Sequence, residues 1–185
     1  GMEGYPQTLD MSLGEFVVVR DNKAVNGAGI YIEDQASNDL GANSVMNVAI
    51  DGATIADNTA TDNGGGIYYH GNNKTIDFNF YLNSGTLTGN KAVHGGGFYG
   101  DRGTNLNPDR VSLNFNGGQI SSCEASGNGG GIYVSGLHIG CAENPEKGMV
   151  LSDNKTNQNT DGVGYGGGMF ITSDAVFNMN SGEVS

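Results

Sequence analysis

Short stretches in which apolar and polar residues alternate recur along the chain. The clearest are Leu113-Asn114-Phe115-Asn116 and Phe177-Asn178-Met179-Asn180. Alternation at every second residue is the pattern of a β-strand with one buried face, because successive side chains of a strand point to opposite sides. No window spaces its apolar residues as an amphipathic helix does. The pattern therefore predicts a protein built of short strands.

A second pattern repeats five times: small residues, mostly glycine, precede a hydrophobic residue and then an aromatic one. The five copies are Gly27-Ala28-Gly29-Ile30-Tyr31, Gly64-Gly65-Gly66-Ile67-Tyr68, Gly95-Gly96-Gly97-Phe98-Tyr99, Gly129-Gly130-Gly131-Ile132-Tyr133 and Gly166-Gly167-Gly168-Met169-Phe170. Upstream of the copies lies a second column, Asn22, Asn58, Asn90, Cys123 and Asn154, at intervals of 36, 32, 33 and 31 residues. A repeat at nearly constant spacing indicates a repeat architecture.

Aligning the chain on this second column brings others into register. An aliphatic column stands three residues earlier, at Val19, Ile55, Leu87, Ile120 and Leu151, and a small-residue column two residues later, at Ala24, Ala60, Ala92, Ala125 and Thr156. Each period holds three short strand-like segments, in one period Phe80 to Leu82, Leu87, and Phe98-Tyr99. Stacking each period on the previous one pairs equivalent strands in parallel, about 4.8 Å apart. We predict a right-handed parallel β-helix of about five coils with three strands per coil.

Each column then has a physical role. The aliphatic columns form a narrow core, and the alanine column marks a tight corner. The residues Asn22, Asn58, Asn90, Cys123 and Asn154 are predicted to form a ladder of amide hydrogen bonds between coils. The glycine runs let the backbone turn with positive φ before each aromatic strand.

This combination of Gly-Gly-x-Ile/Leu/Val with an upstream strand and Asn resembles the repeats of bacterial surface β-helices. The nearest are chlamydial polymorphic outer-membrane proteins and autotransporter-adhesin-like passengers, within the pectate-lyase-like fold group. The resemblance covers roughly residues 11 to 185, and Leu87-Thr88-Gly89-Asn90 carries Leu where the family's Phe-x-x-Asn element has Phe. It implies a β-helix on the bacterial cell surface or outside the cell. It does not select an activity, because adhesins, polysaccharide lyases and hydrolases share this scaffold.

The organisation along the chain is simple. We interpret residues 1–10 as a cloning remnant and lead-in, and residues 11–185 as a single β-helix domain. The first coil is irregular, because Phe16 to Val19 read as a strong strand while Ser12 and Gly14 occupy the expected core columns. At the other end Val184 falls on the Leu87 column, before the next ladder position. We expect a piece of a longer surface protein, or an end covered by neighbouring domains or a partner chain.

Composition narrows the partners. The chain has 20 acidic and 8 basic residues, a net charge of −12, which disfavours nucleic-acid binding because phosphates require the opposite sign. It has no apolar run long enough to cross a membrane, so no membrane insertion of this segment is expected. Cys123 and Cys141 are read either as two free thiols or as one disulfide. No cofactor and no metal are expected.

Candidate catalytic residues are confined to one charged loop, residues 100–110. Arg102 or Arg110 would provide a base or a clamp for carboxylates, Asp101 and Asp109 are the further candidates, and loops on a rigid scaffold often carry function. The competing interpretation is that two Asp/Arg pairs close a surface loop. The three histidines stand in different columns, so they do not predict a metal site or a triad.

The best candidate for ligand binding is the aromatic column Tyr31, Tyr68, Tyr99, Tyr133 and Phe170. The hydrophobic residue before each ring must point the other way. If those residues face the core, five stacked rings face outward and offer a strip for sugar rings or a protein partner. If the rings face inward, they are core. We favour the outward orientation, under which variable loops covering the strip remain an alternative.

The sequence thus favours a non-enzymatic, adhesin-like or structural segment of an extracellular or bacterial cell-surface protein, with glycans or a host or cell-surface protein as partner. The alternative is a carbohydrate-active enzyme, either a polysaccharide lyase or a glycoside hydrolase, which would need a cluster of carboxylates. A pure spacer between functional domains is a third reading.

Overall fold

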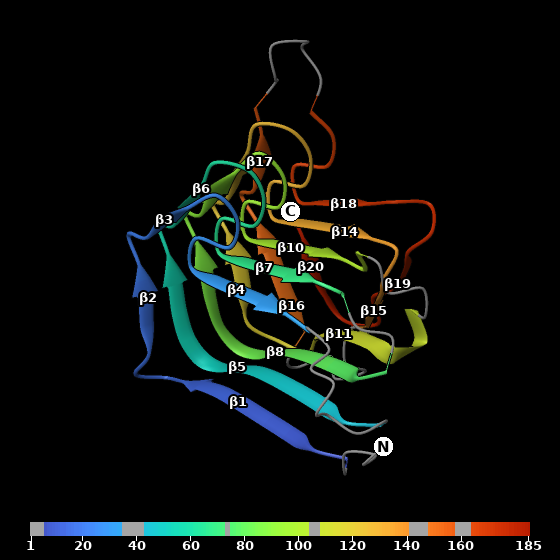
Figure 1. Cartoon of the computed structure of the whole chain (residues 1–185). Helices are drawn as coiled ribbons and strands as arrows, with labels where there is room; N and C mark the ends of the chain where they lie inside the picture. Colours follow the sequence, from blue (N-terminus) through green and yellow to red (C-terminus); the bar gives the residue numbers. More distant parts are fainter. Residues whose placement is uncertain (1–5, 35–42, 73–74, 104–107, 141–147, 158–163) are drawn as a thin grey trace.

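The computed structural model describes residues 6–34, 43–72, 75–103, 108–140, 148–157 and 164–185. These residues form short strands that pair in parallel and one 3-10 helix, η1 (Pro108–Arg110). The strands build three sheets that wind around a common core, coil upon coil (Figure 1). The predicted parallel β-helix of about five coils with three sheets is confirmed.

The largest sheet, here called the long sheet, has ten strands. They are β1 (Thr8–Gly14), β2 (Val18–Arg20), β5 (Val45–Ala56), β8 (Asp77–Thr88), β11 (Val111–Phe115), β12 (Gln119–Ser121), β15 (His138–Gly140), β16 (Met149–Ser152), β19 (Val176–Asn178) and β20 (Gly182–Val184). The strands β5 and β8 each run without interruption through a bend of the long sheet. At the bend, Gly52 and Gly85 have φ of 111° and 100°.

The two smaller sheets have five strands each. The corner sheet contains β3 (Lys23–Ala24), β6 (Thr59–Ala60), β9 (Lys91–Ala92), β13 (Glu124–Ala125) and β17 (Lys155–Thr156). The aromatic sheet contains β4 (Ile30–Glu33), β7 (Ile67–His70), β10 (Phe98–Asp101), β14 (Ile132–Ser135) and β18 (Met169–Ile171). In Figure 1 the strands of the aromatic sheet run side by side above the curve of the long sheet.

The structure assigns the segments of each coil to the three sheets differently from the sequence interpretation. The segments around Phe80 and Leu87 belong to one bent sheet, since β8 contains both. The third sheet is formed at the alanine column, which the sequence marked only as a corner. Two residues are enough to pair there because each small side chain lets the next coil approach: Ala60 and Ala92 are 4% and 8% exposed.

The core is filled by the predicted aliphatic and aromatic columns. Ile55, Leu87, Ile120 and Leu151 are completely buried, as are Phe80, Leu82, Leu113 and Phe115. Each such side chain removed from water contributes roughly 1.5–3 kcal/mol. The rings of Phe80 and Phe98 pack 5.0 Å apart across the core, so the long sheet and the aromatic sheet are held together by direct contact.

The asparagine column makes hydrogen bonds from coil to coil. Asn58 donates both its backbone N–H and its side-chain Nδ2 to Oδ1 of Asn90, each at 3.0 Å, and Asn22 makes the same two bonds to Asn58 at 3.1 and 2.9 Å. Asn90 Nδ2 also donates to the Ile55 carbonyl at 2.9 Å. Asn58 and Asn90 are fully buried, so these bonds satisfy groups that water does not reach.

Cys123 occupies the fourth place in the asparagine column. It is a free, buried cysteine whose Sγ lies 3.9 Å from Asn90 Nδ2. Burial raises the pKa of the thiol to about 11, so the side chain is neutral at physiological pH. Cys141, its possible disulfide partner in the sequence, lies outside the described residues.

The turn before each asparagine has the same unusual backbone in every coil. The residues Asp21, Asp57, Gly89, Ser122 and Asp153 have φ of 59°, 53°, 62°, 54° and 56°. Glycine reaches this left-handed region at no steric cost, and aspartate tolerates it better than most residues. The alternation of Asp, Gly and Ser in this column is therefore explained by backbone conformation.

The first coil corrects one sequence prediction. In the β1–β5 pairing Met11 lies opposite Val48 and Leu13 opposite Ile50, so apolar residues take the positions predicted for Ser12 and Gly14. The cause is one extra residue in the first coil between Leu13 and Val19, because Leu13 pairs 37 residues ahead, with Ile50, whereas Val19 pairs 36 residues ahead, with Ile55. Only Val18 and Val19 of the predicted strand are in β2, and Phe16 lies in a turn with 91% of its surface exposed.

The last coil agrees with the predicted register. Phe177 pairs with Ile139, and Val184 pairs with Leu151 on the aliphatic column. Phe177 and Met179 pack against the core.

Candidate functional site

The outer side of the aromatic sheet carries the candidate site. Ile67, Phe98 and Ile132 are completely buried in the core, so the aromatic residue after each of them points outward. We call this outer side the aromatic face. Its first column is Tyr31, Tyr68, Tyr99, Tyr133 and Phe170, which the strand register places directly opposite one another.

The five rings form one continuous stack. Their centroids are separated by 5.0 Å (Tyr31–Tyr68), 5.2 Å (Tyr68–Tyr99), 4.8 Å (Tyr99–Tyr133) and 5.2 Å (Tyr133–Phe170), with interplanar angles of 24°, 8°, 7° and 20°. The spacing matches the distance between neighbouring strands. Because both faces of each inner ring pack against neighbouring rings, a ligand beside the stack meets ring edges and hydroxyl groups.

Exposure differs along the stack. Tyr68 retains only 8% of its surface, whereas Tyr31, which ends the stack in the first coil, retains 50%. His94 and Tyr165 pack at ring distances of 5.4 Å and 6.4 Å from Tyr133 and Phe170. The stack is thus partly covered along its length and open at Tyr31.

A second, polar column runs beside the rings on the same face. It lies two residues after each aromatic residue and consists of Glu33, His70, Asp101, Ser135 and Thr172, which we call the polar row. Strand alternation puts both columns on the outer side. Sequence reasoning missed this row, although an offset of two residues from the aromatic column would have found it.

The centre of the polar row is a histidine–carboxylate pair. His70 Nδ1 and Asp101 Oδ1 are 2.8 Å apart, and the backbone N–H of Gly103 donates to the same Oδ1 at 2.7 Å. His70 also stacks on Tyr68, with ring centroids 6.2 Å apart. A carboxylate held on Nδ1 orients the imidazole and directs Nε2 away from the pair, an arrangement that suits hydrogen bonding or proton transfer.

The tyrosine hydroxyls experience this negative charge. Burial, and then the charge of Asp101, raise the pKa of Tyr68 to about 12. The same two causes raise the pKa of Tyr99 further. At the open end, the Tyr31 hydroxyl donates to Glu33 Oε2 at 3.3 Å, and burial together with Glu33 raises its pKa. The phenols therefore remain neutral hydrogen-bond donors at physiological pH.

The four charged loop residues do not gather into one cluster. Asp101 belongs to the polar row, and Arg102 reaches Asp174 on another coil at 3.2 Å. Arg110 contacts Asp77 at 2.9 Å and the Thr75 carbonyl at 3.0 Å. Asp109 lies 3.9 Å from His138. These contacts join different coils.

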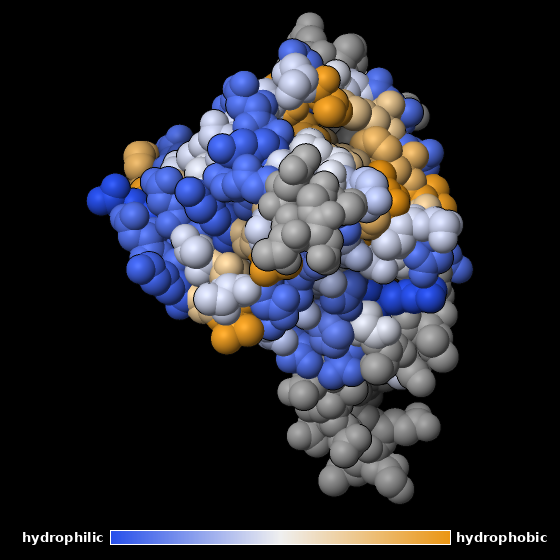
Figure 2. Space-filling view, turned by 90° about the horizontal axis from the view of Figure 1, so that it is seen from above, coloured by the Kyte–Doolittle hydropathy of each residue, from blue (hydrophilic) through white to orange (hydrophobic). Residues whose placement is uncertain are grey.

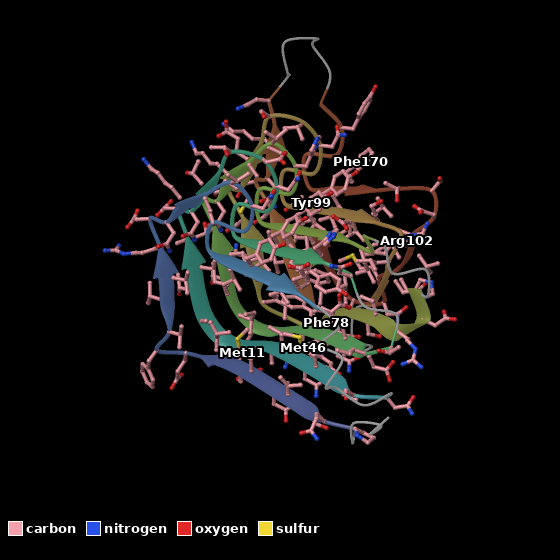
Figure 3. The ribbon with its side chains drawn as sticks, in the orientation of Figure 1. Met11, Met46, Phe78, Tyr99, Arg102 and Phe170 are labelled. Carbon is pink, nitrogen blue, oxygen red and sulfur yellow. The ribbon has the colours of Figure 1, made fainter. Side chains whose placement is uncertain are left out.

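Of the two arginines in the 100–110 loop, only Arg102 is near the aromatic face. Figure 3 shows it beyond the ends of the strands that carry Tyr99 and Phe170. Seen from above, hydrophilic residues cover most of the described surface, and apolar residues form separate patches (Figure 2).

Two other properties of the described residues bear on function. They contain no group of three or more His, Cys, Asp or Glu side chains arranged to hold a metal ion. In the same part of the chain, no helix is long and apolar enough to span a membrane.

Comparison of the chain with protein-family models, curated proteins and solved structures found no match. The resemblance to bacterial surface repeats therefore rests on the repeat pattern alone.

Proposed function

We propose that this chain is a non-enzymatic β-helix segment of a bacterial cell-surface or secreted protein, and that it acts outside the cell as an adhesin-like or structural element. The observation that carries the proposal is the aromatic face, on which stacked rings and a polar row extend across five coils. A solenoid core held by buried hydrogen bonds keeps this face rigid, and a rigid surface loses little entropy when it binds.

The chemistry of the face suits recognition. Its hydroxyls donate, its carboxylates accept, and its ring edges offer apolar contact, which is the combination that glycans and protein surfaces use. Glu33, His70 and Asp101 are already held by neighbouring groups, so they are pre-organised as contact points. Glycans or a cell-surface protein are therefore the proposed partners.

The test is retention of labelled protein on a panel of immobilised acidic and neutral polysaccharides and on intact cells. We expect saturable retention on part of the panel, reduced by Tyr99→Phe, which keeps the ring and removes the hydroxyl. Tyr81→Phe is the matched control, because Tyr81 stands on the long sheet. Retention that Tyr99→Phe leaves unchanged would place binding elsewhere, and no retention on any surface would favour a spacer.

A carbohydrate-active enzyme is the second candidate, and one observation favours it. Glu33 and Asp101 flank His70 in the polar row, two strand spacings apart, which is about 9.6 Å at the backbone. Inverting glycosidases separate their two carboxyl groups by about 6.5–9.5 Å. Assay for released products, with Glu33→Gln and Asp101→Asn as variants, distinguishes this candidate from the binder.

A further inference from the structure

Tyr31 ends the ring stack and presents an accessible surface there. One face of its ring packs on Tyr68 at 5.0 Å, yet half of its surface remains exposed, against 8% for Tyr68. A planar group placed on the outer side of Tyr31 would continue the stack in the direction that the four following rings already define. Among the five stacked rings, Tyr31 thus has the most room for a ligand.

A carboxylate is fixed beside this ring. Glu33 is two residues further along the same strand and on the same side, about 6.6 Å away at the backbone. Its Oε2 accepts from the Tyr31 hydroxyl at 3.3 Å, and its Oε1 accepts from Asn72 Nδ2 at 3.0 Å. A carboxylate has about four lone-pair sites, so two remain to accept from a ligand.

The charges around the Tyr31–Tyr68 pair are negative. Glu33, Asp62 and Asp101 all act on the phenol of Tyr68. Among the described residues, two nearby basic groups are engaged with carboxylates, His70 with Asp101 and Arg102 with Asp174. With a net charge of −12 on the whole chain, the potential at this end of the stack attracts cations.

We propose that Tyr31 and Glu33 bind an arginine side chain of a partner polypeptide, with the guanidinium stacked on the outer face of the ring and paired to the carboxylate. This inference rests on the proposed binding function and names the class of partner: a protein surface with an exposed basic residue. Arginine fits better than lysine because its planar group stacks on aromatic rings and donates to a carboxylate along one edge. A neutral sugar would gain nothing from the negative potential.

The test is an NMR titration of the whole chain with the peptide acetyl-Gly-Arg-Gly-amide, following the Tyr31 ring and the backbone amides. We expect weak, saturable binding with shifts centred on Tyr31 and Glu33. Replacing arginine by citrulline, its neutral isostere, should weaken binding at least about fivefold. Tyr31→Leu and Glu33→Gln should each weaken it about three- to tenfold, as expected for cation–π contacts and partly exposed ion pairs.

Two matched variants keep the test specific. Tyr31→Phe retains the stacking surface, so it should bind within about twofold of the parent. Glu15→Gln changes the net charge as Glu33→Gln does but lies in the turn between β1 and β2, and it should bind as the parent. Equal binding of the citrulline peptide, or equal losses in Glu15→Gln and Glu33→Gln, would overturn the proposal. Retention on glycans or cells without arginine binding would overturn this inference and leave the proposed function standing.

Discussion

Replacing Asn90 by alanine removes the most connected member of the asparagine column. Its Oδ1 accepts two hydrogen bonds from Asn58, and its Nδ2 donates to the Ile55 carbonyl. The Asn58 amide nitrogen keeps a second acceptor, the Val19 carbonyl at 3.1 Å, but the Asn58 backbone N–H loses its partner. Asn58 and Ile55 are completely buried, so water does not replace the lost bonds.

The cost follows from these two backbone groups. Leaving a buried donor or acceptor unsatisfied costs about 1–3 kcal/mol, so two of them amount to about 2–6 kcal/mol. Asn22→Ala is the matched control. Asn22 is exposed at the first coil and only donates to Asn58, so its removal should cost about 0.5–1 kcal/mol.

Urea unfolding followed by far-ultraviolet circular dichroism measures the difference between the two variants. Hydrogen exchange of the Asn58 amide adds a local measurement, which is needed because solenoids can unfold in parts. We expect a clearly lower urea midpoint and faster Asn58 exchange in Asn90→Ala than in Asn22→Ala. Equal midpoints and equal exchange rates would refute the view that buried amide bonds stabilise the coils.

Other variants test separate parts of the account. Cys123→Asn should raise the free energy of unfolding by about 1 kcal/mol, because an amide can accept from Asn90 where the thiol accepts weakly; a lower urea midpoint would contradict this. Gly65→Ala should lower the free energy of unfolding by about 3 kcal/mol, since the added Cβ would meet the Lys91 carbonyl oxygen at 2.4 Å. A thermal melt like that of the parent would contradict this close approach. Phe16→Ser should change stability by less than about 0.5 kcal/mol because the ring is 91% exposed; a larger loss would show that the ring is packed. Folding raises the pKa of Tyr68 from 10.0 to about 12. The resulting stability is fully present below pH 10 and is lost as pH rises through about 12, so the Tyr68 phenolate, followed by its absorbance, should form together with alkaline unfolding.

The sequence predicted the coil because equivalent residues of successive repeats lie beside one another in the structure. Val19 and Ile55 stand one period apart, as do Leu151 and Val184, and parallel stacking turns that spacing into direct contact. It failed in the first coil, where one extra residue moved Leu13, and not Gly14, onto the core column. A single-residue shift exchanges inward and outward side chains, and the sequence before the first repeat offers no second copy that would fix the register.

The candidate site was predicted only in part. The aromatic column was visible because Tyr and Phe are rare and recur in register, but the polar row mixes five residue types and forms no obvious column. The pairing of Arg102 with Asp174 joins the residue after β10 to a residue between β18 and β19, two coils later. Contacts of this kind depend on loop conformation, which periodicity does not encode.

Incubation with acidic and neutral polysaccharides, with and without calcium, tests most directly whether the chain binds its partner without transforming it. Retained polysaccharide and newly formed reducing or unsaturated ends are measured in the same samples. The account predicts retention of part of the panel and no new ends in any sample. Release of products that disappears in Glu33→Gln or Asp101→Asn would contradict it and identify the chain as a carbohydrate-active enzyme.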